Sequence, residues 1–351
     1  MNKGCTFRWS SRGAGVVVCV ALLAACGPAV ADGSSAAGDV VASPLAASTE
    51  VSSLPAATRS EAGTDDTAAG SAAAAVVPGA PPGTVRALAE ADGRTLAVGV
   101  DDTGPAAWSV DDDAWRTHEV AQVTGVPRLD AVASDGSTGI AFGAGDAGGS
   151  QAWMTDDLRT WRPVDTPAIA GRVAAVTVAD GRWIAVGDRV DPEGGEAYEG
   201  VVWAAGEGAA FTVLSDGLAL SEGTVSDVAV ANGTVVVAGF DVAGGLVWTA
   251  SGDDFTRATG PFEAATVDGV AATPDGFIAL GRGLGDLALR AWSSTDGSRW
   301  EAVEVLAADL EPQDEIHDVA TVAGVVTVGG GTGSAGAVWT FENGTLSRVR
   351  S

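Results

Sequence analysis

The side chains best suited to metal, redox or nucleophilic chemistry are scarce in this sequence. It has two histidines, His118 and His317, and one tyrosine, Tyr198. All three cysteines, the last of them Cys26, lie near the N-terminus. Zinc and copper sites draw on clusters of histidine and cysteine, so the sequence predicts no metal site and no cofactor.

Glycan hydrolysis stays open, because most glycosidases need only two carboxyl groups. The chain has 46 acidic residues, so some carboxyl pairs will lie close by chance and do not discriminate. Tyr198 is followed directly by Glu199, and neighbouring side chains of a strand point to opposite faces, which places Glu199 badly to activate the phenol. We therefore expect no catalytic residues, and a glycan-active enzyme (sialidase-like or another glycoside hydrolase) is the alternative to a binding protein.

The elements that position these side chains form a repeat over residues 85–351. Each unit predicts an apolar strand, a turn, a second strand ending in glycine, a third strand with a tryptophan, and a fourth strand opening on a large apolar residue. The tryptophans, which we expect to be packing residues, are Trp108, Trp153, Trp203, Trp248, Trp292 and Trp339. Six such units predict an all-β fold, a six-bladed β-propeller of four-stranded antiparallel blades.

The turns between the first and second strands are rich in Asp-Gly and Asn-Gly. They are Asp92-Gly93, Asp135-Gly136, Asp180-Gly181, Asn232-Gly233, Asp275-Gly276 and Ala323-Gly324. Such pairs supply the positive φ angles of a two-residue hairpin, which we expect in every unit. Calcium loops are the alternative interpretation, but the chain lacks the spacing of acidic residues that an EF-hand loop requires.

One turn between the third and fourth strands carries a family resemblance. Ser294-Thr295-Asp296-Gly297-Ser298-Arg299-Trp300 resembles the Asp-box of sialidase-type propellers without the residue between Asp and Gly, and Thr155-Asp156-Asp157-Leu158-Arg159-Thr160-Trp161 is a weaker copy. The glycine that ends strand two, followed by aromatic residues in strands three and four, also resembles the pattern of kelch repeats. These resemblances imply a propeller and no particular activity. Sialidase chemistry would need an arginine cluster, and no arginine here stands in the Arg-Ile-Pro context of that family.

Binding residues are expected in the loops between strands two and three, which share one end of the ring with the links between blades. These loops vary in length, and variable loops on a rigid scaffold commonly carry binding sites. From the longest loop and the end of the fifth unit's second strand we predict the contact residues Arg189, Tyr198, Glu199 and Arg282. A buried arginine and carboxylate cluster in one mouth of the ring would favour the enzyme, and a flat mouth lined by small residues would favour a scaffold.

The N-terminal region predicts export. Lys3, Arg8 and Arg12 precede a short apolar stretch that ends in Leu23-Ala24-Ala25-Cys26, which resembles a bacterial lipobox. We therefore expect a lipoprotein signal peptide over residues 1–25, lipidation at Cys26 and a disordered Ala/Ser/Gly/Pro-rich tether over 26–84. Cleavage after Ala31, which would leave a secreted protein, is the alternative.

Charge and composition complete the prediction. The formal net charge is −27, which argues against nucleic acid because phosphate binding needs a basic surface. The sequence predicts a monomeric, non-catalytic lipoprotein on the extracellular face of the cell membrane, held by its lipid anchor. Its propeller would bind or scaffold a protein or glycan partner that the sequence does not identify, and a soluble-ligand or cation-binding accessory protein is a further alternative.

Overall fold

The computed structural model describes residues 81–112, 114–145, 149–165, 169, 171–190, 198–206, 210–218, 223–311, 313–332 and 335–349. Backbone hydrogen bonds within this part of the chain form 26 β-strands grouped in six sheets. No helix among these residues has the length and apolar character needed to cross a membrane. The predicted signal peptide, the lipidation site Cys26 and most of the predicted tether lie outside the described residues.

Each sheet is one blade built from consecutive strands. Blade 1 comprises β1 (Thr84–Ala91), β2 (Arg94–Asp101), β3 (Gly104–Asp111) and β4 (Ala114–Thr117). Blade 2 comprises β6 (Ala131–Ser134), β7 (Gly139–Ala144), β8 (Ser150–Thr155) and β9 (Thr160–Val164). Blade 3 comprises β10 (Arg172–Ala179), β11 (Arg182–Val190), β12 (Tyr198–Ala205) and β13 (Thr212–Leu218). Blade 4 comprises β14 (Thr224–Ala231), β15 (Thr234–Asp241), β16 (Gly244–Ala250) and β17 (Thr256–Arg257). Blade 5 comprises β18 (Gly269–Thr273), β19 (Gly276–Arg282), β20 (Leu289–Ser294) and β21 (Glu301–Val303). Blade 6 comprises β23 (Glu315–Val322), β24 (Val325–Thr332), β25 (Ala335–Glu342) and β26 (Thr345–Arg348).

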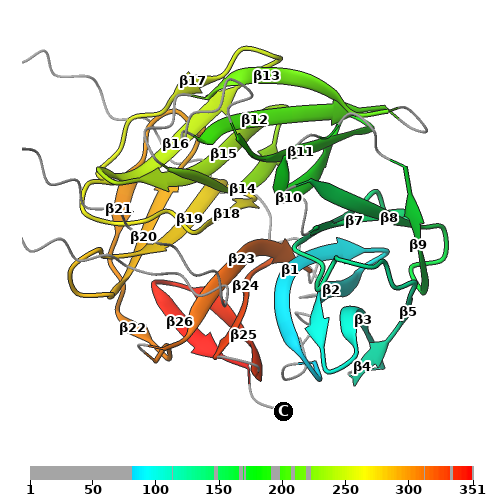
Figure 1. Ribbon diagram of the computed structural model, residues 1–351. Coiled ribbons are helices and arrows are strands. Elements are labelled where there is room, and N and C mark those ends of the chain that lie inside the picture. Colours follow the sequence, from blue (N-terminus) through cyan, green and yellow to red (C-terminus); the bar gives the residue numbers. More distant parts are fainter. Residues whose placement is uncertain are drawn as a thin grey trace, which may run out of the picture. The chain divides into compact units, whose positions relative to one another are not determined.

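The six-bladed propeller predicted from the repeat is confirmed. The ring closes where β1 of the first blade lies beside β23 and β24 of the last (Figure 1). No strand is exchanged between these two blades in the described part of the chain, since each sheet takes its four main strands in sequence order. Closure uses side chains instead. The Leu88 N–H donates to Asp318 Oδ2 at 2.6 Å, and the Ala323 N–H donates to Glu90 Oε2 at 2.7 Å.

Two blades carry a short fifth strand that the repeat did not predict. After leaving blade 1, the chain forms β5 (Glu119–Val120), which pairs in parallel with the outer strand β9 of blade 2. After blade 5 it forms β22 (Ala307–Ala308), which pairs in parallel with β26 of blade 6. The links between blades therefore run along the outer edge of the next blade before they cross to the ring centre.

The predicted two-residue turns with positive φ occur in four blades. The turns of blades 1, 3, 4 and 6 have both residues at positive φ, as at Asp92 (51°) and Gly93 (70°). In blade 5 the prediction is wrong, because Pro274 fixes a negative φ and the two loop residues are Pro274 and Asp275. In blade 2 a four-residue turn replaces it, and Asp135 Oδ1 accepts the N–H groups of Ser137 and Thr138.

A β-bulge explains why strand two ends in glycine in every blade. Register shifts mark it in four inner strands, for example between Val85 and Ala87. The bulge turns a backbone carbonyl of the inner strand over the facing glycine, so that a Cβ on Gly99 would collide with Thr84 O. The same collision occurs at Gly143, Gly187, Gly239, Gly281 and Gly330. In blade 6 the required glycine is thus Gly330, one residue later than the repeat indicates.

The core consists of six apolar clusters, one between each pair of neighbouring blades. The third-strand tryptophan of every blade belongs to the cluster shared with the preceding blade: Trp108, Trp153, Trp203, Trp248, Trp292 and Trp339. All six are at most 3% exposed. The prediction that they are packing residues is confirmed, and they hold blade to blade.

Candidate functional site

The bulges place a ring of side chains at the start of the six inner strands, at the end of the propeller that carries the links and the strand 2–3 loops. We call this end the mouth. The bulge residues of blades 1, 3, 4 and 6 are Arg86, Ala174, Ser226 and His317, and Asp130 and Asp268 occupy the equivalent positions in blades 2 and 5. Two residues before each of them stand Thr84, Arg128, Arg172, Thr224, Thr266 and Glu315. Most of these side chains are polar, although the strands themselves are apolar.

The densest part of the mouth joins blades 6, 1 and 2. Asp130 Oδ1 accepts Arg128 Nε at 2.6 Å and lies 3.5 Å from Arg86 Nε. Arg86 Nη1 contacts both ring nitrogens of His317, at 3.1 and 3.3 Å. Glu315, which is largely exposed, lies 3.7 Å from His317 Nε2. The Asp130 carboxylate therefore contacts both guanidinium groups, and His317 contacts the guanidinium group of Arg86 as well.

Electrostatics fix the roles inside this cluster. Burial, then the charges of Arg86 and Arg128, lowers the pKa of His317 to about 3. The imidazole is therefore neutral at physiological pH, so it can accept a hydrogen bond from Arg86. Burial also lowers the pKa of Arg86 below its ordinary value, against the opposing effect of Asp130. Asp130 is the only carboxylate that contacts both guanidinium groups in the described part of the chain.

Both arginines keep hydrogen-bond donors for a ligand. The contacts to Asp130 use the Nε atoms. Within the described residues, no hydrogen bond is formed by Arg86 Nη2 or by either Nη atom of Arg128. The side chains are 27% and 35% exposed, so solvent and ligands can reach them. Fixed, forked guanidinium donors are suited to carboxylate or phosphate groups.

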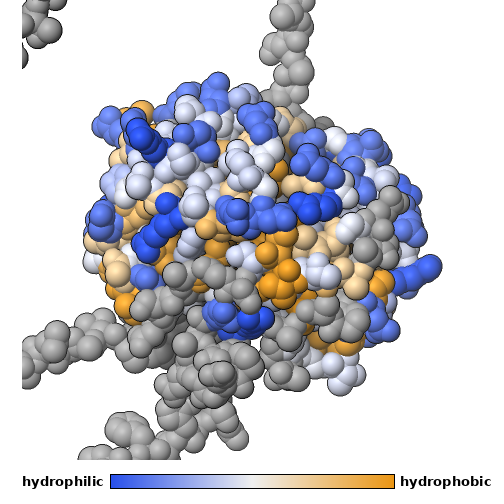
Figure 2. All heavy atoms as spheres, turned by 90° about the horizontal axis from the view of Figure 1, so that it is seen from above, coloured by the Kyte–Doolittle hydropathy of each residue, from blue (hydrophilic) through white to orange (hydrophobic). Residues whose placement is uncertain are grey.

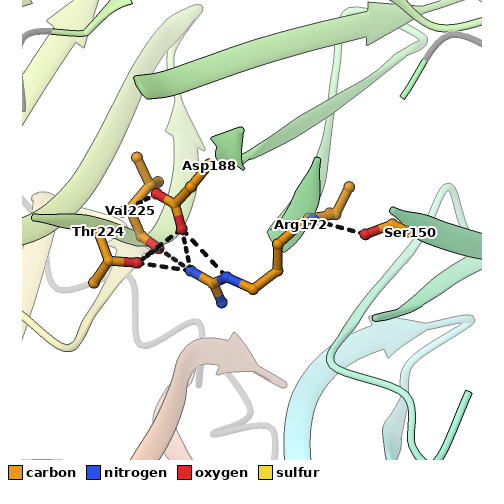
Figure 3. A network of polar contacts seen from close by, with 6 residues as sticks. Ser150, Arg172, Asp188, Thr224 and Val225 are labelled. Atoms are coloured by element: carbon orange, nitrogen blue, oxygen red, sulfur yellow. Dashed lines mark hydrogen bonds and ion pairs between the residues drawn. The ribbon is translucent and has the colours of Figure 1, made fainter. Parts of the chain in front are cut away.

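A second arginine network joins blades 3 and 4 (Figure 3). Arg172 Nη2 donates to Asp188 Oδ2 at 2.5 Å, to Thr224 Oγ1 at 2.7 Å and to the Val225 carbonyl at 3.1 Å. Asp188 Oδ1 accepts the Val225 N–H at 2.8 Å. Through Nη2, Arg172 binds Asp188 of its own blade as well as Thr224 and Val225 of the neighbouring one, so this arginine joins blades 3 and 4.

On the far side of the mouth, Asp268 of blade 5 has an unusual ionisation. Burial raises its pKa to about 6, although Thr266 and Arg282 act in the opposite direction. Arg282 itself donates from Nη2 to the Asp314 carbonyl at 2.6 Å, which ties strand β19 to the link before blade 6. Asp268 is therefore partly protonated near neutral pH, which is the state that a general acid needs.

Beneath the mouth, the six inner strands surround a cavity of about 230 Å³. Its wall is mostly Ala and Val, with the buried carboxyl groups of Asp227 and Asp318 as the main polar exceptions. Asp227 Oδ2 accepts the Val270 N–H of blade 5 at 2.8 Å, in the same way that Asp318 accepts Leu88 N–H of blade 1. Each of these carboxyl groups joins its own inner strand to the inner strand of the next blade.

A larger hollow of about 500 Å³ lies over blade 5, away from the mouth cluster. Pro261, Leu287, Trp292 and Leu310 are among the apolar residues that line it. Its arginine, Arg290, is already bound to Asp286 at 2.6 Å. We place the candidate site at the mouth, because charged side chains from several blades meet there. Figure 2 shows the molecule turned by 90° from the view of Figure 1, and on this side hydrophilic residues predominate and hydrophobic ones gather in limited areas.

The four predicted contact residues are not brought into one cluster. Arg189 and Glu199 face each other across the β11–β12 hairpin and form an ion pair of 2.8 Å. Tyr198 begins β12 in this hairpin, and its side chain lies outside the described residues, as does the loop 191–197. Arg282 is on blade 5, with blade 4 between it and the others. Its guanidinium group binds the Asp314 and Leu287 carbonyls.

Sequence reasoning missed Arg86, Arg128, Asp130 and His317 because it searched the variable loops. A signal was nevertheless present. When the repeats are aligned on the glycine that ends strand two, polar residues recur at the start of strand one, where an entirely apolar strand was expected. An arginine and carboxylate cluster does exist in the mouth, but only its Asp130 is buried, since the arginines are 27% and 35% exposed; the buried cluster that was expected to favour an enzyme is therefore present only in part.

Comparison with known proteins supports the fold. No protein-family model and no curated protein sequence matches the chain. Among solved structures it resembles YjhT (TM-score 0.51, 11% identity, 78% of this chain and 99% of that one) and the SapL1 lectin in complex with alpha-methyl fucoside (0.56, 13%, 77% and 96%). It also resembles the alpha-L-arabinanase of Penicillium chrysogenum complexed with arabinobiose (0.53, 12%, 76% and 97%). At these identities the chain shares a propeller fold with a lectin and a glycan-active protein, and the likeness extends to the fold alone.

Proposed function

We propose that this chain is a non-catalytic cell-envelope lipoprotein that presents the mouth of its propeller as a binding site for a carboxylate-bearing glycan or protein. The observation that carries the proposal is the pair Arg86 and Arg128, fixed through Nε by Asp130 with Nη donors left over. His317 is neutral there, and the carboxylates of Asp130 and Glu315 belong to the same cluster. In a chain of net charge −27, guanidinium donors that form no hydrogen bond with these carboxylates are suited to bind the carboxylate of a ligand.

Replacing Arg86 and Arg128 together by glutamine tests this site. We expect binding of acidic oligosaccharides, such as oligogalacturonate or sialyllactose, to weaken by about 100-fold, because hydrogen bonds to charged groups contribute about 1.5–3 kcal/mol each. Isothermal titration calorimetry would measure it. Arg94→Gln, on an exposed arginine beside the strand 1–2 turn of blade 1, is the matched control and should bind as the wild type does. Equal binding of neutral oligosaccharides by the wild type would contradict the proposal.

The lipid anchor is tested separately. Changing Cys26→Ser removes the thiol that would receive the diacylglyceryl group, so we expect the protein to lose lipid labelling and to leave the membrane fraction. Metabolic labelling with a fatty-acid analogue and membrane fractionation would measure both. A variant that keeps its label and stays in the membrane would show that the anchor lies elsewhere.

A glycan-active enzyme is the second candidate, and Asp268 is the observation that favours it. Its raised pKa of about 6 suits a general acid at the edge of a mouth that also carries arginines. Hydrolysis of aryl-glycosides by the wild type, lost in Asp268→Asn with binding retained, would establish the enzyme. Absence of turnover across the panel leaves the binding function as proposed.

A further inference from the structure

The third-strand tryptophans do more than pack. In blades 2, 5 and 6 the indole N–H donates to a backbone carbonyl of the link that leads into the same blade. Trp153 donates to Ala121 at 2.8 Å, Trp292 to Pro261 at 3.0 Å and Trp339 to Asp309 at 2.7 Å. The acceptors precede their tryptophans by 32, 31 and 30 residues.

In the same three blades the incoming link pairs in parallel with the outer strand or with the residues that lead into it. In blades 2 and 6 the links are β5 and β22. In blade 5, Thr259 forms a parallel bridge with Arg299. The indole hydrogen bond and the outer-edge pairing thus occur together, as one device by which a link is attached to the blade that it enters.

Blade 1 has the tryptophan without the acceptor. Trp108 is fully buried, and its Nε1 is buried with no hydrogen-bond partner. A buried N–H group without a partner is rare in native proteins. The apolar cluster around Trp108 contains six buried residues, none of which belongs to a link within the described chain. By contrast, the clusters around Trp153 and Trp292 include link residues such as Val126 and Phe262.

The described chain begins beside this indole. A Cβ on Gly83 would lie 2.7 Å from Trp108 Cζ2, so the backbone at Gly83 lies close against the indole. The residues that precede it are therefore within a short extended stretch of the unpaired N–H. Counting back from Trp108 by the spacing of the other blades gives residues 76–78. Counting back from Val85 by the interval between acceptor and inner strand gives residues 77–79.

We propose that the outer side of blade 1 is a docking site for the chain's own segment Ala74-Ala75-Val76-Val77-Pro78, with the Val77 or Pro78 carbonyl accepting the Trp108 N–H. The segment lies outside the described residues, and the sequence assigns it to the tether. Its chemistry fits the site, because two valines extend the smallest of the six apolar clusters. The 31-residue spacing between Pro261 and Trp292 in blade 5 places the acceptor of blade 1 at Val77, directly before Pro78.

Hydrogen exchange of the indole N–H groups tests the docking in the mature chain carrying ¹⁵N-labelled tryptophan. Trp108→Phe identifies the Trp108 signal by its loss. We expect that signal in the wild type to exchange within about threefold of the Trp292 signal. Val76→Pro combined with Val77→Pro removes the backbone N–H groups that would pair with blade 1, and should raise the ratio of the Trp108 rate to the Trp292 rate at least tenfold. Ala68→Pro with Ala69→Pro is the matched control and should leave the ratio unchanged.

Each outcome decides the proposal. A Trp108 signal that exchanges far faster than Trp292 in the wild type would show that no acceptor is bound. An unchanged ratio in the Val76/Val77 variant, even if all rates rise through a general loss of stability, would also overturn it. The readout involves neither lipidation nor ligand, so failure here leaves the tests of Cys26 and of the mouth independent.

Discussion

Changing Trp339→Ala is expected to lower the free energy of unfolding by about 3–5 kcal/mol, the usual cost of removing a buried tryptophan. Trp339 is fully buried in the cluster between blades 5 and 6. Its indole N–H also attaches the link before blade 6 through Asp309. The substitution therefore creates a cavity between two blades and removes the attachment of a link at the same time. Urea unfolding followed by far-UV circular dichroism would measure the loss.

Two variants separate these contributions. Trp339→Phe removes the N–H but keeps most of the ring, and we expect it to cost about 1–2 kcal/mol. Trp115→Ala removes the same side chain from the fourth strand of blade 1, where the tryptophan is only partly buried, and should cost less than Trp339→Ala. If Trp339→Ala proved no more harmful than Trp115→Ala, the packing role of the third-strand tryptophans would be wrong.

The second large effect is expected from the buried carboxyl groups of the ring centre. Burial raises the pKa of Asp318, and burial together with the charge of Asp318 raises the pKa of Asp227. Because the folded pKa exceeds the unfolded one, the folded state holds these protons more tightly. Their contribution to stability is fully present below about pH 4 and is lost as the pH rises towards the folded pKa values.

Changing Asp318→Asn removes one of these titrations while its amide oxygen can still accept the Leu88 N–H. Each unit of raised pKa corresponds to about 1.4 kcal/mol, so we expect the melting temperature at pH 8 to rise by about 5 °C over the wild type. At pH 4 the two proteins should melt together. Thermal scans from pH 4 to pH 8 would measure this, with the exposed Asp102→Asn as control. A constant difference between wild type and Asp318→Asn across the range would contradict the assignment.

Below pH 4 the aspartates of the turns have the opposite effect, because their contribution to stability falls as the pH falls. Hydrogen bonds from the backbone of each turn are the first cause that lowers the pKa of Asp135, Asp157 and Asp296 to about 2. Their contribution is present above about pH 4 and is lost as the pH falls towards 2. Asp157 and Asp296 occupy equivalent places in the two Asp-box-like turns, where the carboxylate accepts two N–H groups. These aspartates therefore act as turn formers.

The sequence by itself determined the architecture, because the signals for it are local. Short strands of two to nine residues, glycine-containing turns and one tryptophan per unit each act within a single blade, and the same signals recur in all six blades. The glycine that ends strand two was visible as a pattern, but its reason, a bulged carbonyl facing it, needed the register of two strands. Pro274 shows the limit of such patterns. Because this proline precedes Asp275, the turn of blade 5 consists of Pro274 and Asp275 and not of the predicted Asp275 and Gly276.

Only the tertiary structure decided where the candidate site lies. Arg86 and His317 are separated by 231 residues, and Asp318 and Leu88 by 230, so their contacts exist because the ring closes. Loop length, the criterion available in the sequence, pointed to Arg189 and Glu199, which bind each other across one hairpin. A propeller instead gathers the first residues of six inner strands around one axis. Each blade supplies only one or two side chains there, and no stretch of the sequence contains the cluster that they form together.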